Sequence, residues 1–106
     1  MIEDGYLRDL VRLRSWKRAL LAKGSDVAAL LEQILSGKEV DLGAGIPELG
    51  ATGKEQRLRR FLELIDRGLK RAATDRFGRC AVCGDALAQA VLDEQPWTER
   101  CLLHPA

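Results

Sequence analysis

The sequence lacks both a recognisable catalytic arrangement of residues and an apolar run long enough for membrane insertion. It has a single histidine in 106 residues and no nucleophile beside a base, so no catalytic constellation can be assembled. No apolar run approaches the roughly 18 residues of a membrane span, and the start, MIED, lacks the basic-then-apolar order of a signal peptide. We therefore expect a cytoplasmic protein that is not an enzyme and has no membrane partner.

Net charge is nearly absent as well, since 17 Lys and Arg residues against 16 Asp and Glu residues give +1. Bulk electrostatics therefore does not favour nucleic acid, and binding a polyanion would need a local basic patch. Hydrophobic residues make up 46% of the chain, which is too many for a disordered protein. A chain of this length forms one domain, or a small module on an extended element.

All three cysteines and the histidine lie near the end of the sequence, at Cys80, Cys83, Cys101 and His104. The spacing, C-x2-C and C-x2-H separated by 17 residues, predicts two knuckles that bind one tetrahedral zinc ion. Four protein ligands leave no open coordination position, so the site is structural. The alternatives are free buried cysteines, or a disulfide that leaves one cysteine over, with a solvated histidine.

An apolar stripe runs along residues 6–36, where no proline occurs. Its members recur every seven residues, as Tyr6, Leu13, Leu20, Val27 and Ile34. This spacing predicts a long helix with a coiled-coil-like seam. Gly24 could instead end one helix, with Ser25 or Asp26 capping the next. The stripe keeps its phase across Gly24, which favours one continuous helix whose glycine lets a partner helix approach closely.

Residues 37–53 are glycine-rich and have little periodicity, which predicts a loop. The loop is either functional or a joint that only reverses the chain. Thr52 and Glu55 then match a capping box, and a second apolar stripe runs to about residue 76. Two helices that each carry one apolar seam bury the seams most simply against each other, as an antiparallel hairpin.

The predicted fold is therefore mainly α. Residues 1–76 form an antiparallel helical hairpin, or coiled coil, with helices at about 6–36 and 54–76 and a tip loop at about 37–53. Residues 77–106 form a small zinc-binding module. If Ser36 lies opposite Lys54, the first turns of the first helix overhang the second and cover this module through Tyr6, Leu7, Leu10 and Leu13. Trp16 and Trp97 are expected near the junction.

The second helix is locally basic. Arg57, Arg60 and Arg71 are candidates for binding phosphate or an acidic partner. Such a run is most often a solvated face that carries ion pairs four residues apart. The pairs expected here are Glu63 with Arg67 and Asp66 with Lys70.

From about residue 56 to residue 104, the chain resembles the DksA/TraR family of bacterial transcription regulators. The resemblance depends on three motifs: DRFGRCxxCG from Asp75, LDxxP from Leu92 and CxxH from Cys101. It implies a zinc-containing hairpin that enters the secondary channel of RNA polymerase, with its tip toward the active centre and without contacting DNA. Glu39 and Asp41 are the tip residues that such a function would use.

The sequence departs from the family at the tip and at the site for the alarmone ppGpp. The family tip carries Asp-x-x-Asp-x-Ala, and only Asp41 can be placed on that pattern here. Leu64 and Gln95 stand where the family has basic residues, and of the alarmone-binding pattern only Arg57 remains. Phosphate recognition needs several convergent cations, so we expect ppGpp to bind weakly or not at all.

Two other functions fit the same residues. The chain would be a zinc-stabilised protein–protein adaptor if it kept the fold and lost the polymerase tip. It would be a nucleic-acid-binding zinc ribbon if arginines such as Arg57, Arg60, Arg71 and Arg79 contacted phosphates, although few aromatics and a small net charge argue against this. In each case we expect a monomer.

Overall fold

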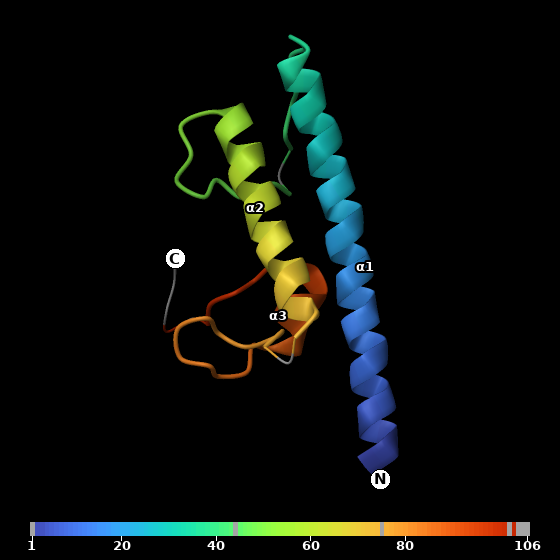
Figure 1. The fold of residues 1–106 in the computed structure, drawn as a ribbon. Helices are drawn as coiled ribbons and strands as arrows, with labels where there is room; N and C mark the ends of the chain where they lie inside the picture. Colours follow the sequence, from blue (N-terminus) through green and yellow to red (C-terminus); the bar gives the residue numbers. More distant parts are fainter. Residues whose placement is uncertain (1, 44, 75, 102, 104–106) are drawn as a thin grey trace.

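The computed structural model describes residues 2–43, 45–74, 76–101 and 103, with residues 2–9 described by their backbone alone. Two long helices, α1 (Ile2–Leu35) and α2 (Lys54–Ala72), lie side by side and run in opposite directions, with the short α3 (Gln89–Glu94) near the lower end of α2 (Figure 1). The molecule is elongated, with extents of 55 × 27 × 21 Å. The prediction of a mainly helical chain with two long packed helices is confirmed.

The rest of the described chain is irregular. Its residues form no strand beyond one isolated antiparallel bridge, between Arg79 and Ala86. In the part of the chain that the structure describes, none of the helices combines the length and the apolarity that crossing a bilayer requires.

The first helix is continuous through Gly24. Leu20 and Val27 of its stripe are fully buried. A Cβ atom built on Gly24 would lie 3.5 Å from Cγ2 of Ile65, so the glycine marks a close approach of α1 to α2. Pairing Ser36 with Lys54 would have set Gly24 opposite Asp66, the sequence neighbour of Ile65, so the observed contact lies close to the expected register.

The first helix ends at a glycine in the left-handed region. Gly37 has φ +88°, and the N–H groups of Gly37 and Lys38 bond to the carbonyls of Ile34 and Gln33, both at 3.0 Å. These two bonds form a Schellman motif, which glycine favours because it has no Cβ to clash. The chain reverses direction here, at the upper end of the hairpin in Figure 1.

The second helix begins without the capping box that the sequence predicted. Gly53 is the N-cap residue and makes no side-chain cap bond. Thr52 donates its N–H to Oε1 of Gln56 at 2.8 Å. Gln56 therefore accepts the backbone hydrogen bond that the capping box had predicted for Glu55. That prediction was wrong because both Gln and Glu can reach back to a free N–H, and the helix starts one residue later than the box requires.

The second helix also ends at Ala72 rather than at about residue 76. The N–H groups of Ala73 and Thr74 bond to the carbonyls of Lys70 and Arg71, three residues back, at 3.2 and 2.9 Å. The Thr74 hydroxyl also donates to the Arg71 carbonyl, at 2.9 Å. A tightened last turn of this kind satisfies the carbonyls that would otherwise continue the helix.

The loop between the helices packs against the hairpin and does not project from it. After residue 38 it runs back beside the helices before it reaches α2 (Figure 1). Its apolar side chains Val40, Leu42 and Ile46 are buried in the hairpin core, together with Phe61 of α2. The loop is therefore a third layer over the upper half of the helix pair.

The lower part of α1 packs against the C-terminal segment. Trp16 lies in one buried cluster with Cys80, Leu87 and Leu92, and Leu13 packs against this cluster. The indole Nε1 of Trp16 donates to Oδ1 of Asp93 at 2.8 Å. Leu10 is half-buried, whereas the expected contacts of Tyr6 and Leu7 fall on side chains outside the described residues.

The second tryptophan joins the C-terminal segment to α2. Trp97 meets the ring of Phe61 edge-on, with ring centroids 4.8 Å apart. Gly68 of α2 approaches the same segment, since a Cβ atom on it would lie 3.7 Å from the Cα of Trp97. The base of the hairpin and the cysteine-rich end thus share apolar contacts on both helices.

Candidate metal centre

The first two cysteines lie on a short turn closed by backbone bonds, the first knuckle (residues 79–86). The N–H of Cys80 bonds to the Asp85 carbonyl at 2.8 Å, and the N–H of Gly84 bonds to the Cys80 carbonyl at 2.9 Å. Gly84 has φ +77°, a conformation that glycine adopts without strain. This tight reversal aims the side chains of Cys80 and Cys83 toward the same side.

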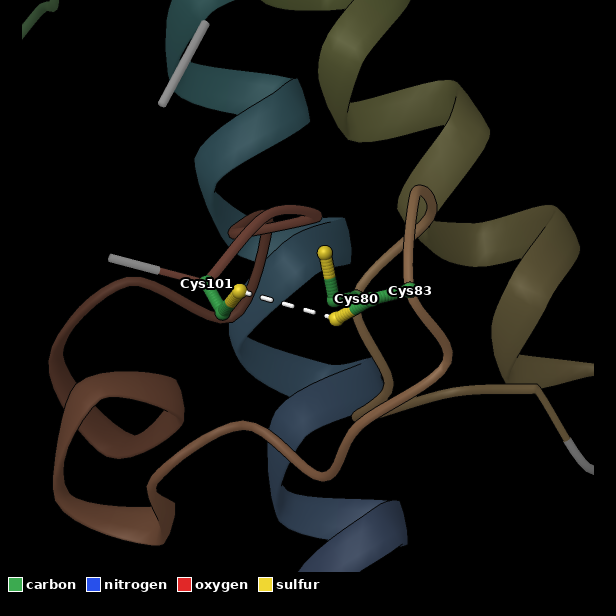
Figure 2. A group of neighbouring side chains, drawn as sticks. All are labelled: Cys80, Cys83 and Cys101. Carbon is green, nitrogen blue, oxygen red and sulfur yellow. Dashed lines mark hydrogen bonds between the residues drawn. The ribbon is translucent and has the colours of Figure 1, made fainter. Parts of the chain in front are cut away.

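The third cysteine reaches the knuckle from the segment that follows α3. Figure 2 shows the sulfur atoms of Cys80, Cys83 and Cys101 gathered together, and they all lie within 4.8 Å of one another. Sγ of Cys83 and Sγ of Cys101 are 3.7 Å apart. Cys80 is buried, Cys101 is half-buried and Cys83 is exposed. Two parts of the chain that are far apart in the sequence therefore present three thiols to one point.

The separation of the sulfur atoms fits ligands of one tetrahedral ion. With a Zn–S bond of about 2.3 Å, the edge of a tetrahedron is about 3.8 Å, close to the 3.7 Å between Cys83 and Cys101. A disulfide requires an S–S distance of about 2.05 Å, which the 3.7 Å between Cys83 and Cys101 far exceeds. Among the described residues, these three are the ones that form a group able to hold a metal ion. His104, the predicted fourth ligand, lies outside the described residues.

The thiols differ in acidity because their surroundings differ. Burial raises the pKa of Cys80, but hydrogen bonds from the backbone N–H groups of Cys83, Cys101 and Val82 outweigh this and lower it to about 6. A hydrogen bond from the Asp85 backbone lowers the pKa of Cys83, but burial and the two neighbouring sulfurs raise it to about 11. Cys80 therefore gives up its proton more readily than Cys83, and binding of a cation would favour the deprotonated form of both thiols.

A carboxylate beside the cluster, Glu99, was missed in the sequence. Its side chain accepts hydrogen bonds from Nε of Arg67 at 3.0 Å and from Nη1 of Arg71 at 2.8 Å. Burial raises the pKa of Glu99, but the two guanidinium groups lower it by more than burial raises it. The net shift of this pKa is therefore downward. No sequence signal links Glu99 to α2, because the three residues are brought together by the tertiary fold.

Two ion pairs had been expected on α2, and one of them forms. Lys70 and Asp66 are 3.0 Å apart on the exposed face, as predicted. Arg67 takes Glu99 as its partner at 3.0 Å, and Glu63 only raises the pKa of Arg67 from a distance. Glu99 is half-buried and also bonded to Arg71, which favours it as the partner of Arg67 over the exposed Glu63 of the same helix.

The other candidate residues on α2 contact the loop. Arg57 donates through Nη2 to the Ile46 carbonyl, and Arg60 donates through Nη1 to the Leu49 carbonyl at 2.7 Å. Lys54 donates in the same way to the Val40 carbonyl. The structure therefore gives Arg57 and Arg60, like Arg71, partners within the chain.

The two candidate tip carboxylates lie on the folded loop. Glu39 and Asp41 are exposed, and Oδ1 of Asp41 accepts the N–H of Gly43 at 3.1 Å. A carboxylate that bonds to the backbone two residues on forms an Asx-turn. The far end of the hairpin is formed by the last turn of α1 and residues 36–38 (Figure 1).

Comparison with models of protein families, with curated proteins and with solved structures finds nothing that matches this chain.

Proposed function

We propose that the chain is a zinc-stabilised, non-enzymatic transcription regulator of the DksA/TraR type, which binds RNA polymerase through its secondary channel. The observation that carries the proposal is the convergence of Cys80, Cys83 and Cys101 at the foot of an elongated helical hairpin. In such a protein the hairpin is a rigid probe and the metal centre fixes its foot. The chain acts as a cytoplasmic monomer, makes no contact with DNA and has little or no affinity for ppGpp.

In this proposal the ion is zinc, and His104 completes the tetrahedral site with the three thiols. Three thiolates and a neutral imidazole around Zn²⁺ leave a net charge of minus one. The metal supplies structural order, because so small a module has little hydrophobic surface to bury. Metal analysis of the purified protein should give one zinc per chain. His104→Ala should lower zinc affinity, whereas Leu103→Ala, at an exposed side chain, should leave it unchanged.

A pull-down with core RNA polymerase tests the partner. We expect binding at micromolar concentration that a known secondary-channel factor displaces by competition. Asp41→Asn should weaken the effect on transcription if the carboxylate faces the active centre. Glu48→Gln is the matched control, since Glu48 is an exposed carboxylate of the same loop. Absence of polymerase binding at micromolar concentration would reject the proposal.

One observation favours a second candidate, a zinc-stabilised protein–protein adaptor. The loop that carries Glu39 and Asp41 is packed back along the helices, with Val40, Leu42 and Ile46 in the core. A carboxylate held there is poorly presented to the catalytic centre of a polymerase. If this candidate is correct, Asp41→Asn changes no transcription readout, while Cys80→Ser abolishes binding to the partner protein.

A further inference from the structure

We infer that Glu99 is a positioning residue for the metal centre: it holds the segment that carries Cys101 both to α2 and to the first knuckle. The inference uses the metal centre of the proposed function and is independent of the polymerase. It starts from the segment that carries Cys101, residues 95–101, which contains no helix or strand. Something other than regular secondary structure must place this cysteine opposite the other two.

The carboxylate of Glu99 connects the segment to α2 through two arginines. Oε1 accepts from Nε of Arg67 at 3.0 Å and from Nη1 of Arg71 at 2.8 Å, and Oε2 accepts from Nη2 of Arg67 at 3.3 Å. The exposed fractions of the Glu99 and Arg71 side chains are 19% and 18%. Charge-assisted bonds in such a sheltered position are stronger and more directional than bonds between neutral groups.

The main chain of the same residue connects the segment to the first knuckle. The Glu99 carbonyl accepts the N–H of Ala81 at 2.7 Å. Ala81 directly follows Cys80, and Glu99 precedes Cys101 by two residues. One residue therefore contacts both parts of the chain that supply the thiols. The backbone between Glu99 and Cys101 spans at most about 7 Å.

The charges around the cluster agree with a positioning role and not with ligation. Glu99 with Arg67 and Arg71 carries one net positive charge, which complements the single negative charge of a zinc centre with three thiolates and one imidazole. Both oxygens of the carboxylate accept hydrogen bonds from guanidinium groups of α2, which orients the side chain toward that helix. Among the described residues, the group able to hold an ion contains the three cysteines and no carboxylate.

Metal affinity in Glu99→Gln tests the inference. The amide keeps the size and the backbone bond but loses the charge, and loss of a group that orients a ligand typically lowers metal affinity by about 10–100-fold. The affinity of the full chain for Zn²⁺ is measured by competition with a chromophoric chelator. Glu94→Gln is the matched control, an exposed carboxylate on α3 that should change affinity by less than about threefold.

A spectrum of bound Co²⁺ separates positioning from general stability. The charge-transfer absorbance of a Co²⁺ centre depends on how many thiolates it has, so detachment of Cys101 removes roughly one third of it. We expect this loss in Glu99→Gln at saturating Co²⁺, and partial recovery in Glu99→Asp, which restores the charge. If Glu99→Gln does not fold, Arg67→Gln gives the same test with a milder change, since the Arg67 side chain is 51% exposed.

Equal Zn²⁺ affinity and an equal Co²⁺ spectrum in Glu99→Gln and Glu94→Gln would overturn the inference and leave the metal centre standing. A wild-type chain that binds neither ion would overturn the metal centre itself, together with any positioning role for Glu99. The two failures are distinguishable because the second is visible in the wild-type protein before any variant is made.

Discussion

Two glycines, one on each long helix, lie where that helix contacts the other. Replacing each of them by alanine tests the helix packing with one kind of substitution. A Cβ atom on Gly24 of α1 would meet its nearest neighbour, Cγ2 of Ile65, at 3.5 Å, which is ordinary contact. A Cβ atom on Gly68 of α2 would meet Cδ2 and Cδ1 of Leu20 at 3.3 and 3.4 Å. Leu20 is fully buried, so it has little room to move. The same methyl group should therefore have opposite effects at the two sites.

The magnitudes follow from helix propensity and overpacking. Alanine in a helix interior is favoured over glycine by about 0.5–1 kcal/mol, so Gly24→Ala should raise the free energy of unfolding by that amount. This corresponds to a rise of about 2–8 °C in the melting temperature of a domain of this size. Overpacking costs about 1–3 kcal/mol, so Gly68→Ala should lower the free energy of unfolding by up to about 2 kcal/mol.

The assay is urea and thermal unfolding of the zinc-loaded protein, followed by far-ultraviolet circular dichroism. Each variant serves as the control for the other, because both add one methyl group to a helical glycine. If Gly24→Ala destabilised the protein as much as Gly68→Ala, the register that sets Gly24 beside Ile65 would be refuted.

Three further predictions concern the metal, the loop and the base of the hairpin. If zinc is bound as proposed, excess chelator should lower the melting temperature and shift the emission of Trp16 to the red, measured in a Trp97→Phe protein. An unchanged spectrum would contradict the link between the ion and the buried cluster that contains Trp16 and Cys80. Arg60→Ala should lower the free energy of unfolding by about 1 kcal/mol through loss of a charge-assisted bond to the loop. The control, Arg59→Ala, removes only an exposed ion pair and should lower it by about 0.3–0.5 kcal/mol. Equal losses would show that the bond from Arg60 does not stabilise the loop. Because the net pKa shift of Glu99 is downward, its contribution is complete above about pH 4.3, the unfolded value, and is lost as the pH falls through the lower folded value. The difference in melting temperature between the wild type and Glu99→Gln should therefore be largest at neutral pH and shrink below about pH 4, and a difference that does not change with pH would refute the ion pairing.

The helix pair was predictable because its signal is periodic and local. A stripe that keeps heptad phase through Gly24 is hard to bury except along one partner helix, and the register followed from aligning the two helix ends at Ser36 and Lys54. The convergence of the cysteines was predictable for a similar reason, since C-x2-C fits a tight turn and the spacing led us to expect Cys101 to meet the first two cysteines at one point.

The packing of the loop was not predicted because its glycines drew attention away from the apolar residues Val40, Leu42 and Ile46, which fall on alternate positions. The loop nevertheless contains four large apolar residues, Val40, Leu42, Ile46 and Leu49, and this is the signal that could have indicated burial. The role of Glu99 had no local signal at all. Its partners Arg67 and Arg71 lie about thirty residues away, and a pattern within a short window favours closer pairs such as Glu63 with Arg67.

The bonds that hold the loop lead to a rule for how its sequence can vary. The loop is bonded through its main-chain carbonyl oxygens, which accept hydrogen bonds from Lys54, Arg57 and Arg60. Every amino acid supplies a carbonyl oxygen. Exposed positions between residues 39 and 50 can therefore vary as long as the apolar side chains stay buried, except at Gly43 and Gly50, whose positive φ favours glycine. Adding or deleting one residue would displace each later carbonyl by up to about 3.5 Å, beyond the reach of its cation, so homologues should preserve the length of this stretch more strictly than its composition.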